Sequence, residues 1–418
     1  MFDDDEFDSW FKSYQKKMLP EFIEYLSIDT SSGRERNAIP FLESLLGDYG
    51  FDCCLEDYHP ELFNHQARTV SDAFSGKVNL RAKYGVGSID NKVVLFNSHI
   101  DVVPVEGEGT KLLTPWLEEG YVYGRGACDT KGNLFLLLGA LAFLKYKKCT
   151  PQYKVHLDLV SEEEVGGNGT LSTILHGVLA DLVIVFEPTD LEVHRGHRGC
   201  LTCETTIIGK SVHMGSDSDG LSAITVAVRL MDELRSLEQE MLADAKEDSA
   251  FSIWRRPLQI NIGKVCGGEW PGSVPEKCKL LFNVGFLPKY SIPEIEAIIE
   301  NRIGLLEQIF PGVKVSFDFN SGLRNKAYIV SDKDQLLRQL SESISIARCI
   351  ARSAPIYAWR ASCDARHYAQ EANIPTAIFG AGSLGEAHSS NERIEINQMR
   401  VGTKALSMFL MGRNAEPM

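Results

Sequence analysis

The fold is decided by a short apolar run that ends in polar side chains, Val93-Val94-Leu95-Phe96-Asn97-Ser98-His99-Ile100-Asp101. Its apolar part, 93–97, predicts a strand that is buried on both faces. Strands are also predicted at 154–160, 182–186 and 376–379. Helices are predicted around them, at 7–26, 38–49 and 132–147. Buried strands separated by helices predict an α/β domain with a mainly parallel central sheet.

The pattern changes in the middle of the chain. The predicted order there is strand, helix, strand, strand, helix, strand, over residues 200–208, 221–241, 258–264, 278–286, 293–310 and 313–319. This is the order of a ferredoxin-like α+β unit. A chain of 418 residues also exceeds the usual size of a single hydrophobic core. We therefore predict one α/β domain built from 1–198 and 322–418, with the unit 199–321 inserted in it.

The composition is that of a globular protein with an acidic surface. Hydrophobic residues make up 44% of the chain and charged residues 24%, and the formal net charge is -14. A surface of this sign repels phosphate groups, so we expect no nucleic-acid partner.

The sequence predicts neither a membrane span nor a secretory signal. The longest apolar run, 134–144, is shorter than the ~20 residues that a spanning helix needs. The first six residues, 1–6, have no basic start and no apolar core. Ten cysteines without regular spacing indicate reduced thiols. We therefore expect a cytoplasmic protein without a membrane partner.

Polar residues follow the predicted strands of the α/β domain, where open sheets of this kind bind their ligands. They are His99 and Asp101 after 93–97, Glu162, Glu163 and Glu164 after 154–160, Glu187 after 182–186, and His388 in the loop after 376–379. Asp129 precedes the helix at 132–147. Two histidines and several carboxylates are therefore predicted to meet at one edge of the sheet.

Such a cluster of carboxylates needs cations, because like charges repel strongly in a partly dry cleft. A dinuclear metal site meets this need. Imidazoles among the ligands favour zinc over calcium or magnesium, whose sites are built from oxygen. We expect two zinc ions per chain, with cobalt or manganese as alternatives.

Five segments that carry these residues resemble, in order along the chain, the motifs of the dizinc aminoacylase and peptidase family. They are Ser98-His99-Ile100-Asp101-Val102-Val103-Pro104, Gly126-Ala127-Cys128-Asp129-Thr130-Lys131-Gly132, Glu162-Glu163-Glu164-Val165-Gly166, Glu187-Pro188-Thr189 and Ala387-His388-Ser389-Ser390-Asn391-Glu392. That family includes acetylornithine deacetylase, succinyl-diaminopimelate desuccinylase, aminoacylase-1 and glutamate-releasing carboxypeptidases. The resemblance implies a metallopeptidase-type catalytic α/β domain and an inserted lid and dimerisation domain.

The resemblance also implies roles for single residues. One metal is expected on His99 and Glu187, the other on Glu164 and His388, with Asp129 between them. Asp101 is expected to accept the other ring N–H of His99 and fix its tautomer. Glu163 is the expected general base. The segment 209–215 resembles the family segment whose histidine reaches the active site of the other subunit, so His213 is the candidate oxyanion stabiliser in a homodimer.

Recognition of a substrate carboxylate departs from the family pattern. Many relatives have Asp-x-Arg in the strand of the inserted domain that corresponds to 278–286, whereas this chain has Gly285 at the place of the arginine. Arg324 is the candidate substitute, with a solvated hinge arginine as the alternative. Arg366 also matches a family segment, and a structural ion pair is its alternative. Glu162, His194 and His197 are taken as solvated or satisfied residues.

The sequence thus predicts a metal-dependent hydrolase of linear amide bonds in small molecules. The leading hypothesis is an N-deacylase of the acetylornithine deacetylase and desuccinylase type. A dipeptidase or carboxypeptidase with the same metals is the alternative. A catalytically silent metal-binding protein is disfavoured, because it has no need for a base at Glu163.

Overall fold

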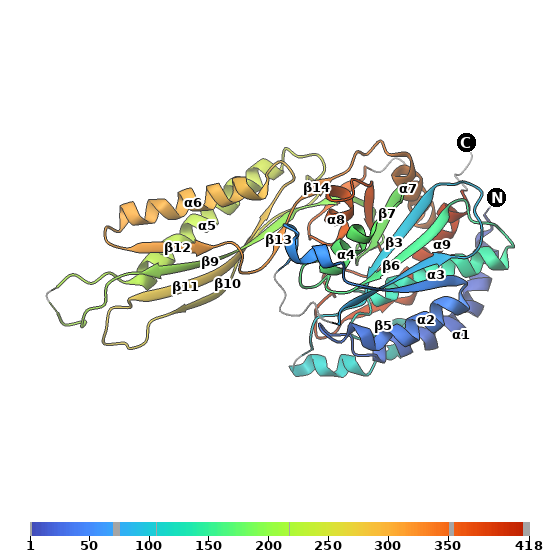
Figure 1. Ribbon diagram of the computed structural model, residues 1–418, viewed down its shortest axis with the longest axis horizontal. Coiled ribbons are helices and arrows are strands. Elements are labelled where there is room, and N and C mark those ends of the chain that lie inside the picture. The colour runs from blue at the N-terminus through green and yellow to red at the C-terminus, as the bar shows by residue number, and fades with distance from the viewer. Residues whose placement is uncertain (1, 70–75, 106, 217, 351–354, 413–418) are drawn as a thin grey trace. The chain divides into compact units, whose positions relative to one another are not determined.

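A computed structural model describes residues 2–69, 76–105, 107–216, 218–350 and 355–412. The chain forms two compact units (Figure 1). The first unit contains the chain up to Gly196, Val330–Ile356, and the chain from Cys363 on. The second unit contains His197–Ile329 and Tyr357–Ser362.

A mixed sheet forms the centre of the first unit, with the strand order β1-β2-β6-β3-β7-β16 and β8 paired to β16. The strands are β1 (Phe51–Asp57), β2 (Val78–Tyr84), β6 (Lys154–Val160), β3 (Val93–His99), β7 (Leu182–Phe186), β16 (Thr376–Phe379) and β8 (His194–His197). The four inner strands from β6 to β16 are parallel to one another. This arrangement confirms the predicted mainly parallel central sheet.

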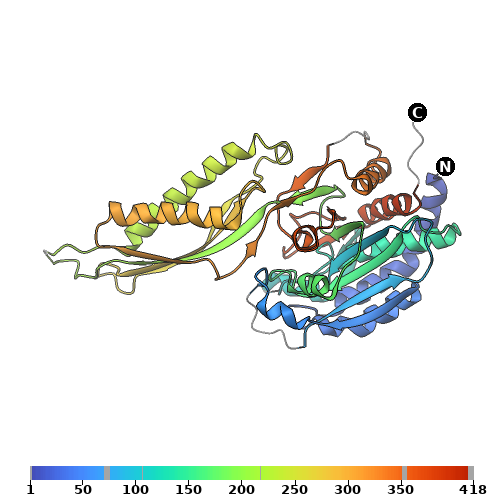
Figure 2. The ribbon, with the colours of Figure 1, turned by 45° about the horizontal axis from the view of Figure 1, so that its top comes forward.

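Helices from both the N-terminal and the C-terminal segments of the first unit cover this sheet (Figures 1 and 2). They are α1 (Asp4–Ser27), α2 (Ile39–Asp48), α3 (Lys131–Tyr146), α4 (Asn168–His176), α7 (Gln335–Ala347), α8 (Ala365–Gln370) and α9 (Ile396–Leu410). Helix α3 contacts β3, α1 and α9, and its residues 134–138 are completely buried. The apolar run 134–144 is therefore core packing. Among the described residues, no helix is long and apolar enough to cross a bilayer.

The second unit has the strand and helix order of a ferredoxin-like fold. Its elements are β9 (Gly199–Ile208), α5 (Ala223–Ala245), β10 (Ile260–Gly267), β11 (Lys277–Phe286), α6 (Ile292–Ile309) and β12 (Lys314–Asp318). The strands form an antiparallel sheet in the order β10-β11-β9-β12, and α5 and α6 cover one face of it (Figure 1). A capping box of Ser291 and Glu294 fixes the start of α6. The predicted α+β architecture is thus present in this segment.

Candidate metal centre

The predicted ligands converge at the carboxyl ends of three neighbouring parallel strands. His99 is the last residue of β3, Glu163 and Glu164 follow β6, and Glu187 follows β7. Because β6, β3 and β7 are adjacent, their ends place these side chains at one edge of the sheet. Asp129 approaches from the segment before α3, and His388 comes from the loop after β16.

Asp129 lies between the two histidines. Its Oδ1 is 3.1 Å from Nε2 of His99, and its Oδ2 is 3.2 Å from Nε2 of His388. The same nitrogen of His388 is 3.0 Å from Oε2 of Glu164. Both oxygens of one carboxylate therefore face different imidazoles, which is the arrangement that a bridging ligand needs.

The geometry fits a metal centre. Two groups of possible ligand atoms, His99 with Glu163 and Glu187 and His99 with Asp129 and Glu164, each lie within 4.8 Å of one another. Two ligands of one tetrahedral zinc ion are about 3.4 Å apart, given bonds of about 2.1 Å. Oε1 of Glu187 is buried without a hydrogen-bond partner. A buried carboxylate oxygen without a hydrogen-bond partner is energetically costly, and a bound metal ion would supply the missing partner of this atom.

The carboxylates of this cluster favour a positive charge on the two imidazoles. Burial lowers the pKa of His99, but the hydrogen bond to Asp129 and the charge of Asp101 outweigh it and raise that pKa well above its usual value. Hydrogen bonds to Asp129 and Glu164 raise the pKa of His388 to about 10. Burial, and then the charge of a neighbouring carboxylate, raise the pKa of Glu163 and of Glu187 well above the usual range. Metal cations can take over the balancing role of the imidazolium charges.

Asp101 makes contacts other than the predicted one. Nδ1 of His99 is 2.8 Å from the main-chain oxygen of Asp101, whereas the carboxylate oxygen is 3.8 Å away. The carboxylate instead accepts the backbone N–H groups of Glu163, at 3.2 Å, and Glu164, at 3.0 Å. The prediction that the Asp101 carboxylate fixes the tautomer of His99 is corrected: the main-chain carbonyl takes that place, and the carboxylate holds the turn after β6.

Two further buried carboxylates, given no role from the sequence, lie close to these residues along the chain. Glu392 accepts the backbone N–H groups of Cys128 and Asp129, both at 3.2 Å, and pairs with Arg125 at 2.5 Å. Glu392 ends the motif 387–392 that contains His388, so the sequence did carry a signal for it. The sequence left Glu162 as either a solvated residue or a buried residue with its hydrogen bonds satisfied. Glu162 is only 1% exposed, so it is not a solvated residue.

The two candidate substrate-binding arginines are both engaged within their own units. In the first unit, Arg366 is buried and donates to the main-chain oxygens of Cys363, at 2.6 Å, and Gly166, at 2.8 Å. In the second unit, Arg324 pairs with Glu296 at 2.5 Å. This pairing argues against Arg324 as a free cation for a substrate carboxylate.

Packing within the second unit explains the glycine at position 285. A Cβ atom built on Gly285 lies 3.1 Å from Nη1 of Arg198 and 3.1 Å from the main-chain oxygen of Gln259. Such contacts are tighter than ordinary van der Waals contacts, so a side chain here would displace Arg198 or the backbone. The side chain of Arg198 already occupies the space next to Gly285 in β11.

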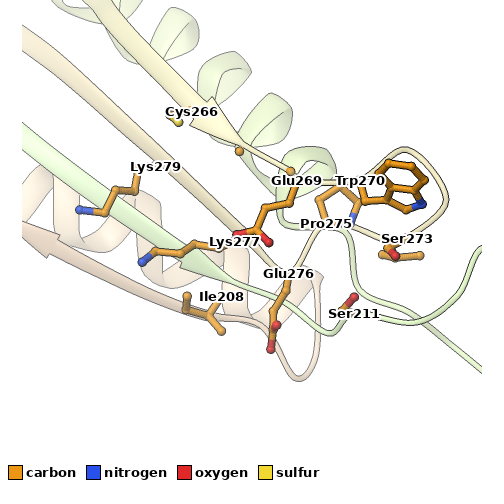
Figure 3. A pocket seen from close by; sticks show the side chains of 13 residues that line it. Ile208, Ser211, Cys266, Glu269, Trp270, Ser273, Pro275, Glu276, Lys277 and Lys279 are labelled. Carbon is orange, nitrogen blue, oxygen red and sulfur yellow. The ribbon is translucent and has the colours of Figure 1, made fainter.

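His213 lies on an exposed loop of the second unit. It forms an isolated bridge with Ser273, and its Nδ1 accepts the backbone N–H of Gly215 at 3.1 Å. Ser273 also lines a pocket of about 600 Å³ between the ends of β10 and β11, together with Ser211 and Trp270 (Figure 3). None of the predicted metal ligands lines this pocket. The catalytic role of His213 stays a prediction.

Comparison with known proteins gives relatives along most of the chain. The family model described as peptidase family M20/M25/M40 matches residues 95–412. An N-formyl-4-amino-5-aminomethyl-2-methylpyrimidine deformylase of Halalkalibacterium halodurans is 28% identical over 78% of this chain and 80% of its own length. A probable succinyl-diaminopimelate desuccinylase of Staphylococcus aureus is 26% identical over 94% of this chain and 98% of its own.

Solved structures share the fold over nearly the whole chain. A tripeptidase from Staphylococcus aureus has a TM-score of 0.72 at 19% identity and covers 95% of this chain and 98% of its own. A dinuclear metal-binding peptidase from Bacillus subtilis has a TM-score of 0.65 at 12% identity and covers 96% and 98%.

Proposed function

The chain belongs to peptidase family M20/M25/M40, and from this premise we propose that it removes an acyl group from a small N-acylated amino acid or amine with the help of two metal ions. Membership confirms the resemblance that the ordered motifs predicted, and with it a hydrolase of amide bonds. Deacylation is favoured because the two curated relatives, which match 78% and 94% of this chain, are named as a deformylase and a desuccinylase.

The observation that carries the proposal is the buried cluster around Asp129. We assign one metal to His99 and Glu187 and the other to Glu164 and His388, with Asp129 between them. Zinc is the proposed ion, and cobalt or manganese suit the same nitrogen and oxygen ligands. When bound, such ions act as Lewis acids that polarise an amide carbonyl and lower the pKa of water.

Glu163 is the proposed proton carrier. It lies in the same group of close ligand atoms as His99 and Glu187, and its backbone N–H is fixed by Asp101. Burial raises its pKa, which suits a carboxylate that must accept a proton from the attacking water and later release it to the amine. Glu163 and Glu164 fall in different groups of possible ligand atoms, so neighbouring carboxylates can take different roles.

Peptide cleavage is the second candidate function. The tripeptidase and the metal-binding peptidase share the fold of this chain at less than 20% identity. The shared fold supports a peptide bond as the alternative target of the same reaction. We also propose a cytoplasmic homodimer in which the second unit acts as lid and dimerisation domain and His213 stabilises the oxyanion, without nucleic-acid or membrane partners.

A substrate screen tests the proposal. Zinc-loaded and cobalt-loaded protein is incubated with N-acetyl, N-succinyl and N-formyl amino compounds and with dipeptides, and the released amine is identified. Activity on acylated amines that disappears on chelation and returns with metal is the expected result. Cleavage of dipeptides alone favours the peptidase, and full activity after metal removal contradicts the mechanism.

A further inference from the structure

We propose that Lys77 and Glu162 are positioning residues that hold the turn carrying Glu163 and Glu164. This inference rests on the proposed function, in which Glu163 carries the proton and Glu164 binds metal. Neither Lys77 nor Glu162 is placed to contact the reacting atoms. Their role is to fix the backbone from which the two functional carboxylates project.

Glu162 starts this turn in a conformation that a side chain disfavours. Its φ angle is 66°, in the left-handed region that glycine adopts easily and other residues rarely do. Because Glu163 and Glu164 follow directly, a change in the backbone at Glu162 would displace both carboxylates together. Something other than local preference must therefore hold residue 162 in place.

The side chain of Glu162 makes the required contacts inside the protein. Its Oε2 accepts from the hydroxyl of Tyr58, at 3.2 Å, and from Nδ2 of Asn168, at 3.1 Å. Its Oε1 is 3.5 Å from Nζ of Lys77. These partners come from three different segments, so the carboxylate of Glu162 is fixed from several sides.

Lys77 connects Glu162 to a second buried carboxylate. Its side chain is 7% exposed, and Nζ is 2.6 Å from Oε1 of Glu35. Glu35 in turn accepts the backbone N–H of Gly33, with both oxygens at 3.0 Å. Removal of Lys77 would leave two buried carboxylates without the cation that they share, which is strongly unfavourable. We expect the turn at Glu162 to move in response.

A buried ion pair can also serve stability alone, so the experiment must separate the two roles. The variants are Glu162→Gly, Glu162→Ala, Glu162→Gln and Lys77→Met. Glycine adopts the backbone conformation of residue 162 without strain but lacks the side-chain contacts. Glutamine keeps the shape and an oxygen that can accept from Tyr58 and Asn168. Lys147→Met, which removes a cation from the surface pair with Glu6, is the matched control.

The readouts are the zinc dissociation constant by chelator competition, kcat and KM at saturating zinc, and the thermal midpoint. Glu162→Gly, Glu162→Ala and Lys77→Met should weaken zinc binding and lower kcat by about 10–100-fold, as expected for groups that orient metal ligands, while KM changes little. Glu162→Gln should recover only part of the loss, because it keeps an acceptor for Tyr58 and Asn168 but presents no charge to Lys77, and Lys147→Met should match the wild type.

Two outcomes would overturn the inference. One is a Glu162→Gly variant with zinc affinity and kcat like the wild type, because the side-chain contacts would then be unnecessary. The other is a set of variants that lose thermal stability but keep zinc affinity and kcat, which marks a purely structural ion pair. If Lys77→Met fails to fold, the Glu162 series decides alone. Zinc affinity also separates this test from the proposed function, because it is measurable if no amide substrate is cleaved.

Discussion

The substitution Asp101→Asn tests the support of the turn after β6 most directly. The carboxylate of Asp101 accepts two backbone N–H groups, from Glu163 and Glu164. Hydrogen bonds to a charged group contribute about 1.5–3 kcal/mol each, and neutral ones about 1 kcal/mol. Asparagine can keep one of them as a neutral bond and turns an NH2 group toward the other donor. The expected loss in the free energy of unfolding is therefore about 2–5 kcal/mol, with zinc affinity and kcat reduced about 10–100-fold.

Urea unfolding of zinc-loaded protein, chelator competition and steady-state kinetics measure the three quantities. Asp158→Asn is the matched control, because Asp158 is an equally buried aspartate that binds Arg81 and Tyr368. It should lose stability and keep zinc affinity. If Asp101→Asn keeps zinc affinity and kcat within about twofold, the carboxylate does not hold the turn, since the smallest effect expected here is about tenfold.

Four further predictions concern the cluster and its surroundings. Glu163→Gln should lower kcat by about 10²–10⁴-fold with metal content intact, whereas Glu164→Gln should lower metal content by elemental analysis; the reverse pattern would exchange their roles. In chelated protein, the raised pKa of His388 stabilises the fold fully below about pH 6.5, and this stabilisation is lost as the pH rises through about 10. The difference in thermal midpoint between wild type and His388→Ala should therefore shrink over that range. A difference that stays constant with pH contradicts this prediction. Arg324→Ala should leave the ratio of kcat/KM for an N-acyl amino acid and its carboxamide unchanged, because that guanidinium is already paired; a selective loss for the acid would restore it as the carboxylate-binding residue. Mixed dimers of His213→Ala and Glu163→Gln subunits should regain activity if the histidine acts across the dimer, and no recovery after verified subunit exchange argues against it.

Buried elements of the fold were predictable because burial leaves a clear sequence pattern. The predicted strands 154–160, 182–186 and 376–379 have the same bounds as β6, β7 and β16. Strand β1 was not predicted, because it is half exposed at the edge of the sheet and its side chains do not alternate cleanly. The three-residue strands β4 (Trp116–Glu118) and β5 (Tyr121–Tyr123) are too short to carry a period.

The convergence of these side chains at one edge of the sheet was also predictable, since the metal-binding types of residue follow buried strands. What could not be predicted is which atom of a residue makes a contact. Asp101 follows His99 closely in sequence, and either its carboxylate or its main-chain oxygen could accept the ring N–H. The choice depends on the turn after β6, whose N–H groups compete for the carboxylate. Lys77 lies far from Glu162 in sequence, so no spacing rule connects them.

Local sequence preference fails at the site for a physical reason. Glu162 and His388 both have φ angles near 60°, where glycine or asparagine is expected from sequence. Each needs its side chain: the carboxylate of Glu162 binds Tyr58 and Asn168, and the imidazole of His388 contacts Asp129 and Glu164. Glycine would relieve the backbone and remove these contacts. The tertiary contacts must therefore offset a disfavoured backbone at both positions, and it follows that losing the contacts should release the backbone as well.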